Sequence, residues 1–131
     1  MKVLSLFDGI SCGMLALQRA GIPVECYDAF EIDKYAVTVS KRNFPVIVHH
    51  GNVYDGDFTQ FQGYDLLLGG SPCTYWSIAK KDREVDCNGE GFRLFKEYVR
   101  ALEESGCKYF LYENNYSVHQ RIKDEISKTL G

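Results

Sequence analysis

The sequence predicts an α/β protein in which an open, mostly parallel sheet of about five strands carries helices on both faces. Two observations lead to this fold class. Short apolar runs typical of buried strands alternate along the chain with segments whose apolar residues recur at helical spacing. The polar residues of chemical interest follow directly after the strand-like runs. Strands that alternate with helices favour right-handed βαβ units, which build a parallel sheet.

The first strand and the first helix are predicted at the N-terminus. Residues 3–7 form a short, β-prone apolar run that ends at Asp8 and Gly9, as expected for a buried strand entering a tight turn. From Ser11, a candidate N-cap, apolar residues recur near helical spacing. This helix is predicted to end at Gly21, which stands where a helix C-cap glycine would.

The same order of strand and helix repeats in the next segment. Residues 24–30 predict a second strand, which ends at Glu31. Asp33 then caps a helix that extends to Asn43. Residues 46–48 predict a third, short strand.

Two further strands and two further helices are predicted in the second half of the chain. Residues 65–68 and 109–112 are apolar runs, and the helical spacing of apolar residues at 92–102 marks a helix between them. A final helix begins at the capping box formed by Ser117 and Gln120.

Length and composition fit one domain in a reducing compartment. The chain has 131 residues, 45% of them hydrophobic and 25% charged, which is enough for one packed core. Five cysteines without a C-x-x-C pair, and histidines that do not cluster, predict neither a disulfide framework nor a zinc site. Without a signal peptide or a membrane-spanning run, we expect a cytoplasmic protein with no metal and no membrane contact. The net charge of -3 and the pI near 5.6 argue weakly against a chain that grips nucleic acid by itself.

Candidate ligand-binding groups stand where the predicted strands end. In open α/β sheets, ligands bind outside the carboxyl ends of the strands, where the strand order reverses. Glycines after the first strand allow a ligand to approach the backbone, and Glu31 ends the second strand, where dinucleotide-type folds bind a ribose diol. The first turn is not G-x-G-x-x-G, which favours an adenosine ligand without phosphates such as S-adenosylmethionine. The alternative is a plain glycine turn and a solvated Glu31.

Cys73 is the candidate nucleophile. It follows the fourth strand, a Gly-Gly pair and Pro72, which fixes the backbone at its approach. Amides at the start of a helix or turn would stabilise a thiolate there. The alternative for a free cysteine is a small buried side chain that serves packing. We favour that packing role for Cys12, Cys26, Cys87 and Cys107.

Four stretches of the sequence together form the pattern of a known family. LSLFDGISCG at residues 4–13 and GGSPC at 69–73 follow strands one and four, while GEGFRLFKEYVRAL at 89–102 and YEN at 112–114 come later. In this order they resemble the cofactor loop, nucleophile loop, following helix and acidic motif of the DNA cytosine carbon-5 methyltransferases, most closely the de novo, animal-type branch. The resemblance implies an incomplete Rossmann-like methyltransferase sheet, with residues 1–131 as the N-terminal catalytic and cofactor-binding part.

The resemblance also implies a cofactor site for S-adenosylmethionine. Its methionine end would be lined by the loop after the first strand, Glu31 would bind the ribose, and Ile32 would pack against adenine. Asn52 departs from the acid often found at its position, so the resemblance leaves its hydrogen-bonding role open. The implied cofactor residues are Phe7, Asp8, Gly9, Ile10, Cys12, Glu31, Ile32, Asn52, Val53 and Pro72.

The implied reaction requires a thiol and a carboxyl group to converge on a cytosine. Carbon 5 is a poor nucleophile, and addition of the Cys73 thiolate at carbon 6 would activate the ring. Glu113 would meet the charge at N3, which requires a carboxyl group with a raised pKa, and Asn114 would orient the base or the loop. The base must first be flipped out of its duplex. The residues implied to contact DNA are Ser71, Lys80, Lys81 and Arg83.

Several alternatives remain open. An ordinary solvated loop is the alternative for the three charges among those DNA-contacting residues. The family's later arginine stretch, its target-recognition region and its C-terminal segment have no counterpart in the sequence, so we expect an exposed sheet edge covered by a complementing or docking polypeptide. The chain is then half of a split enzyme, a catalytically silent cofactor-binding protein that docks on an active relative, or a fragment. An RNA substrate, as in the tRNA-acting relatives, is a further alternative to DNA.

Overall fold

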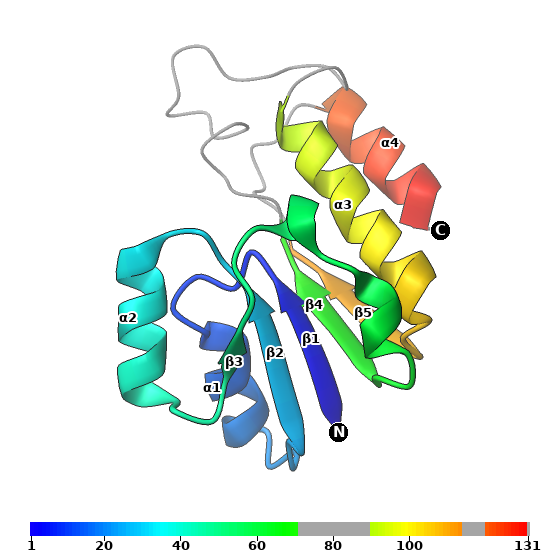
Figure 1. Cartoon of the computed structure of the whole chain (residues 1–131). Helices are drawn as coiled ribbons and strands as arrows, with labels where there is room; N and C mark the ends of the chain where they lie inside the picture. The colour runs from blue at the N-terminus through cyan, green and yellow to red at the C-terminus, as the bar shows by residue number, and fades with distance from the viewer. Residues whose placement is uncertain (71–89, 114–119, 131) are drawn as a thin grey trace.

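The computed structural model of the chain contains a five-stranded parallel sheet with helices on both faces, which confirms the predicted fold class (Figure 1). The structure describes residues 1–70, 90–113 and 120–130. Neighbouring strands are parallel and stand in the order β3-β2-β1-β4-β5, so the order reverses beside β1. The strands are β1 (Lys2–Leu6), β2 (Cys26–Phe30), β3 (Val48–His49), β4 (Leu66–Gly69) and β5 (Tyr109–Tyr112).

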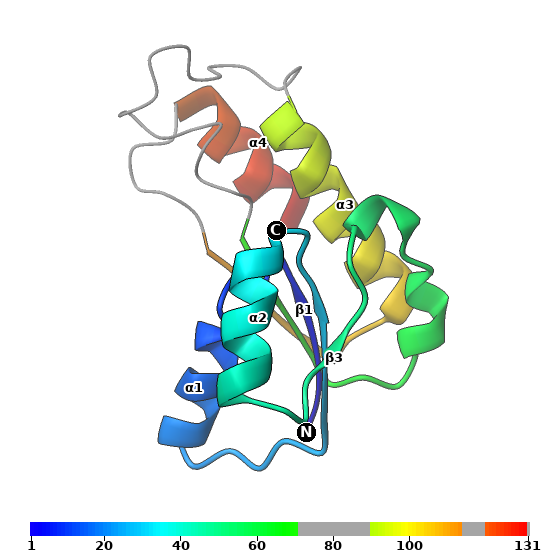
Figure 2. The same cartoon turned by 60° about the vertical axis from the view of Figure 1, so that its left-hand side comes forward.

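The helices lie in two layers, one on each face of the sheet (Figures 1 and 2). One layer holds α1 (Cys12–Arg19) and α2 (Lys34–Asn43), and the other holds α3 (Glu90–Ser105) and α4 (Gln120–Leu130). Two short 3₁₀ segments, η1 (Val53–Asp55) and η2 (Phe58–Phe61), join β3 to β4 on the α3 side and were not predicted. In the part of the chain that the structure describes, no helix combines the length and the apolar character needed to cross a membrane.

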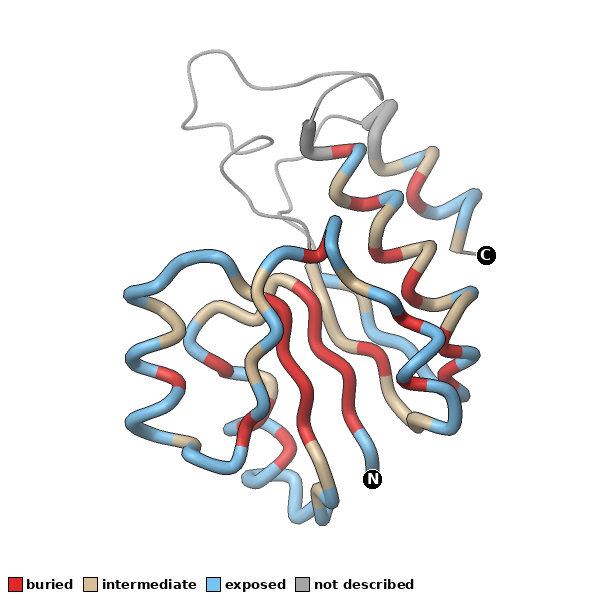
Figure 3. The backbone as a smooth tube through the Cα atoms, in the orientation of Figure 1, coloured by how far each residue is buried: buried red, intermediate tan, exposed pale blue. Residues whose placement is uncertain are grey.

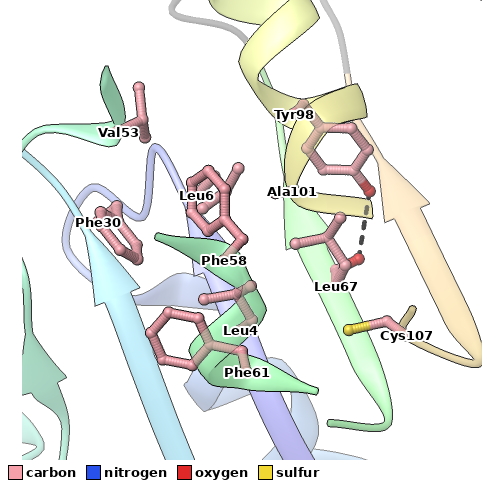
Figure 4. Packing of buried hydrophobic residues seen from close by; sticks show 10 residues of the cluster. All are labelled: Leu4, Leu6, Phe30, Val53, Phe58, Phe61, Leu67, Tyr98, Ala101 and Cys107. Atoms are coloured by element: carbon pink, nitrogen blue, oxygen red, sulfur yellow. Dashed lines mark hydrogen bonds between the residues drawn. The ribbon is translucent and has the colours of Figure 1, made fainter. Parts of the chain in front are cut away.

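Alternating residues of the central strands divide the apolar core between the two faces, because successive side chains of a strand point to opposite sides. Val3 packs with Met14 and Leu17 of α1. Leu4 and Leu6 point the other way, into a cluster built by the 3₁₀ segments and α3 (Figure 4). The buried stretches of β1 and β2 stand out along the middle of the sheet in Figure 3.

The helix ends follow the sequence signals in two of three cases. The Asp33 carboxylate accepts hydrogen bonds from the backbone N–H groups of Tyr35 and Ala36 at 2.9 and 3.4 Å, so it caps α2 as predicted. Gly21 has a φ of 73°, the left-handed conformation that ends α1 and that glycine adopts without strain. Ser11 stands at the N-cap position of α1, but its side chain makes no capping hydrogen bond.

The third strand is shorter than predicted and begins later. Residues 44–47 form a turn in which the N–H of Ile47 donates to the carbonyl of Phe44 at 3.2 Å. Pairing with β2 therefore starts only at Val48, opposite Asp28. The prediction of a strand at 46–48 was wrong in its bounds, because the buried side chain of Ile47 belongs to the turn. The capping role predicted for Ser117 lies outside the described residues.

The packing of the β4–β5 pair depends on a close approach of α3 to the sheet. The fully buried Tyr98 lies over β4 and β5, and its hydroxyl lies 3.2 and 3.1 Å from the carbonyl oxygens of Leu67 and Leu111 (Figure 4). A methyl group on Gly69 would lie 2.9 Å from two ring carbons of Tyr98 and 3.1 Å from the carbonyl oxygen of Leu6. Glycine at position 69 is therefore what lets the helix pack this close to the sheet.

Replacing Gly69 with alanine tests this packing. We expect Gly69→Ala to lower the free energy of unfolding by roughly 1–3 kcal/mol, because the added methyl group must displace a buried ring and a strand. Urea unfolding followed by circular dichroism measures the loss. An unchanged midpoint of unfolding would contradict the close approach of Tyr98.

Candidate active site

Two cavities open at the carboxyl ends of the strands, on either side of Phe7. The first has a volume of about 250 Å³ and includes Glu31, Ile32, Asn52 and Val53 in its lining. The second, of about 230 Å³, is lined by residues of the β1 and β4 ends and by Glu113. Phe7 lines both cavities and therefore forms a shared wall. This position beside β1 is where the strand order reverses and where open α/β sheets bind ligands.

The turn that carries Phe7 has unusual backbone geometry. Phe7 has a φ of 56° and Ser11 a φ of 70°, both in the left-handed region that non-glycine residues seldom occupy. The prediction that residue 7 belongs to the first strand was therefore wrong, since the chain turns out of the sheet at this position. Such strained residues persist only where their surroundings hold them.

The surroundings in this case converge on the carboxylate of Asp8. Its Oδ1 accepts hydrogen bonds from the hydroxyls of Ser5 at 2.7 Å and Tyr27 at 2.6 Å, and its Oδ2 accepts one from Ser11. Burial, together with the charge of Asp8, raises the pKa of Tyr27 far above its ordinary value, so this hydroxyl stays protonated and donates. The hydrogen bond to Asp8 explains why the Ser11 hydroxyl does not cap α1.

Glu31 is held at the entrance of the first cavity by two backbone amides. The N–H of Gly9 donates to its Oε1 at 2.8 Å, and the N–H of Asp33 donates to its Oε2 at 2.9 Å. Because a carboxylate oxygen can accept two hydrogen bonds, each oxygen keeps one acceptor site for a ligand. The carboxylate is therefore fixed in place and is still able to bind a pair of hydroxyl groups.

Asn52 also lines the first cavity, and its side chain shapes the backbone there. Its Oδ1 accepts a hydrogen bond from the N–H of Tyr54 at 3.0 Å and so caps η1. Since an N–H must face an oxygen, this bond fixes the orientation of the side-chain amide. The amide nitrogen is then the group of Asn52 that can meet a ligand. Four further lining residues, which the sequence analysis did not identify, are Phe30, Gly51, Tyr54 and Leu94.

Glu113 and Gly70 are in direct contact at the second cavity. The N–H of Glu113 donates to the carbonyl of Gly69 at 2.8 Å, which continues the β4–β5 pairing. A methyl group on Gly70 would lie 2.3 Å from the Glu113 carbonyl oxygen and 3.2 Å from its carboxylate Oε2. Only glycine permits this approach, which brings the first residues of the GGSPC motif beside the acidic motif.

Some of the remaining predicted site residues lie in the described part of the chain, and the others lie outside it. Asp8 and Cys12 line the second cavity, whereas Ile10 lines a third cavity between α1 and the end of α2. Gly9 contributes its backbone N–H to Glu31. The predicted site residues outside the described part of the chain are Ser71, Pro72, Cys73, Lys80, Lys81, Arg83 and Asn114.

The other cysteines differ in their surroundings. Cys107 is buried, and burial raises the pKa of its thiol, which agrees with the predicted packing role. Cys26 is partly buried. Cys12 is exposed at the start of α1, so the packing role predicted for it was wrong. Cys87 lies outside the described residues.

Similar solved structures share this fold. The crystal structure of S. pombe Dnmt2 methyltransferase matches 99% of the chain with a TM-score of 0.72 and 21% identity, and the chain covers 41% of that protein. A Dnmt2 mutant from Spodoptera frugiperda matches 98% of the chain with a TM-score of 0.68 and 22% identity, covering 40% of that protein.

Curated relatives show clearer similarity in sequence. The orphan methyltransferase M.SPRI of Bacillus phage SPR is 38% identical over 87% of the chain, and the type II methyltransferase M.HgiCII of Herpetosiphon aurantiacus is 34% identical over 86%. The chain spans about a quarter of the length of these relatives, 26% and 25% respectively. Residues 1–130 match the sequence model of the C-5 cytosine-specific DNA methylases. The chain therefore belongs to the family of C-5 cytosine-specific DNA methylases, as its motifs predicted.

Proposed function

We propose that this chain is the cofactor-binding and catalytic part of an enzyme that methylates carbon 5 of cytosine in DNA, with S-adenosylmethionine as methyl donor. The observation that carries the proposal is the contact between Gly70 and Glu113, which follow β4 and β5, next to the reversal of strand order between β1 and β4. It joins the nucleophile motif to the acidic motif at the second cavity, which shares the Phe7 wall with the cavity that Glu31 lines. The description of the family favours DNA as substrate, and the type II methyltransferase among the relatives favours a role in restriction and modification.

The lining of the first cavity fits the adenosine part of the cofactor. Phe7, Phe30 and Val53 supply apolar walls for a flat base. Glu31 keeps two acceptor sites for the ribose hydroxyls, and Asn52 offers an amide donor. The second cavity, beyond Phe7, suits the methionine end and the target base. When bound, the cofactor supplies an electrophilic methyl group.

The chain's own residues then carry the remaining chemistry. Cys73, three residues after Gly70 in the sequence, adds as a thiolate to carbon 6 of the flipped cytosine and turns the ring into a nucleophile. Glu113 holds a proton or hydrogen bond at N3 as charge builds there, and Asn114 orients the base. Once carbon 5 has taken the methyl group, with S-adenosylhomocysteine as the leaving product, a water molecule acts as the base that accepts the carbon-5 proton. The electrons of the broken C–H bond re-form the double bond between carbons 5 and 6 and expel the Cys73 sulfur as a thiolate.

The exposed edge strand β5 supports the proposal that the chain acts together with a further polypeptide segment. Tyr109, Phe110 and Leu111 are 53%, 43% and 62% exposed, and within the described residues β5 has no strand on its outer side. Such an apolar edge is normally paired or covered. We propose that a complementing polypeptide segment covers it and brings groups that bind DNA. A catalytically silent docking protein is less consistent with this sequence, because silence requires neither Cys73 nor Glu113.

Removing the Glu31 carboxylate tests the cofactor site. We expect Glu31→Ala to weaken binding of S-adenosylhomocysteine by roughly 1–3 kcal/mol, because the ribose loses its acceptors. Isothermal titration calorimetry measures the change, and Glu25→Ala, at an exposed glutamate remote from both cavities, is the control. Equal affinity of Glu31→Ala and the parent chain would exclude this site for the cofactor.

Trapping the covalent intermediate tests the nucleophile. In a complete assembly, duplex DNA with 5-fluorocytosine should become attached to Cys73, because fluorine does not leave as a proton does. Peptide mass spectrometry locates the adduct, Cys73→Ser should abolish it, and Cys26→Ser should retain it. An adduct on Cys87, or on none of the cysteines, would refute the role of Cys73.

The activity of the isolated chain tests the need for a complement. We expect little or no transfer of labelled methyl groups to duplex DNA by the purified chain, because orientation of the base contributes up to ~7–11 kcal/mol to such reactions. Addition of a complementing polypeptide should restore transfer. Robust turnover by the chain alone, abolished by Cys73→Ala, would show that these residues suffice.

A further inference from the structure

Arg100 of α3 binds the backbone of the segment that forms one wall of the first cavity. Its Nη2 donates to the carbonyl of Val53 at 3.0 Å, and its Nη1 donates to the carbonyl of Gly56 at 2.8 Å. The guanidinium carbon also lies 4.5 Å from the centre of the Phe58 ring, which is fully buried. One side chain therefore fixes both ends of η1 and the beginning of η2.

Two carboxylates of the same helix complete this contact. Glu97 accepts a hydrogen bond from Nε of Arg100 at 2.6 Å, and Glu104 accepts one from Nη1 at 3.3 Å. The other oxygen of Glu104 accepts a hydrogen bond from the N–H of Phe58 at 3.2 Å. These carboxylates orient the guanidinium, and α3 thus offers a cation to backbone carbonyls and an anion to a backbone N–H.

The same helix supplies another wall of the first cavity. Leu94, fewer than two helical turns before Arg100, lines the first cavity together with Val53. The distance between these two walls therefore depends on how α3 is fixed to the segment 53–58. Arg100 makes that attachment through two charge-assisted hydrogen bonds.

We propose that Arg100 is a positioning residue that links the occupancy of the cofactor cavity to the position of α3. The inference rests on the proposed function, since it takes the first cavity to hold the adenosine part of the cofactor. A ligand that contacts both walls is bound best when Arg100 holds them at the right separation. By reciprocity, the bound ligand stabilises α3. In the sequence, α3 follows directly on the segment that carries Cys73, so the link joins the cofactor to the nucleophile's segment.

Arginine is required for this role, because lysine lacks the planar fork. Lysine keeps the positive charge, but its single ammonium group does not match two carbonyls and a stacked ring at once. Arg100→Lys thus separates the geometry of the contact from its charge. Lys96→Met provides a matched control, since Lys96 is an exposed cation of the same helix that lies over Phe92 and lines neither wall.

Ligand affinity and hydrogen exchange of the full chain test the proposal, with S-adenosylhomocysteine as the probe. By calorimetry, we expect Arg100→Met to bind roughly tenfold more weakly than the parent chain and Arg100→Lys to bind several-fold more weakly. Lys96→Met should bind as the parent chain does. In exchange measurements, the ligand should slow the amides of α3 in the parent chain and in Lys96→Met, and should leave them unchanged in Arg100→Met.

The outcomes distinguish a positioning role of Arg100 from a purely structural role and from a first cavity that does not bind the cofactor. Unchanged affinity in both Arg100 variants, with lowered thermal stability, would show that Arg100 only stabilises the fold and would overturn the proposal. Ligand protection of α3 that persists in Arg100→Met would also overturn it. If Arg100→Met does not fold, Arg100→Lys decides between these results. A parent chain that does not bind the probe would overturn the proposed function, and the positioning role with it.

Discussion

The carboxylate of Asp8 stabilises the turn between β1 and α1. In this turn Phe7 and Ser11 have positive φ angles, which residues other than glycine seldom adopt. Ser5, Ser11 and Tyr27 donate three hydroxyl groups to this one acceptor, from two strands and from the start of a helix. Left-handed residues on either side of Asp8 cost energy that these hydrogen bonds offset. The wall between the two cavities and the amide of Gly9 at Glu31 both follow from that turn.

The contacts that support the site differ between the two faces of the sheet. On the α1 side, a buried polar cluster extends from Asp8 through Ser11 to Ser40 of α2. On the α3 side, Arg100 and Glu104 bind backbone groups of the 3₁₀ segments, and the Arg100 guanidinium also lies over the Phe58 ring. Hydrogen-bonded polar groups of this kind favour one arrangement of the elements that they join. The cavities lie where these two rigid arrangements meet.

The sequence predicted the elements with strong periodicity and local signals, and it failed where distant contacts decide. The strands, the Asp33 cap and the position of Glu31 follow from patterns within a few residues. Ser11 carries the signal of an N-cap, but its hydroxyl donates instead to the Asp8 carboxylate, which also accepts a hydrogen bond from Tyr27, 19 residues further along the chain.

Other parts of the site carried no local signal. The 3₁₀ segments depend on α3, about 45 residues further along the chain, as the contact between Val53 and Arg100 illustrates. Leu94 looked like an ordinary apolar position on a helix, and only the folded chain brings it to the cavity.

The exposed outer edge of β5 affects how the protein can be handled in solution. Among the described residues no strand pairs with the outer edge of β5, where the exposed side chains of Tyr109, Phe110 and Leu111 follow the charged Lys108. Uncovered strands of this kind act as templates for strand pairing between molecules, so β5 is the surface through which concentrated samples of this chain would aggregate.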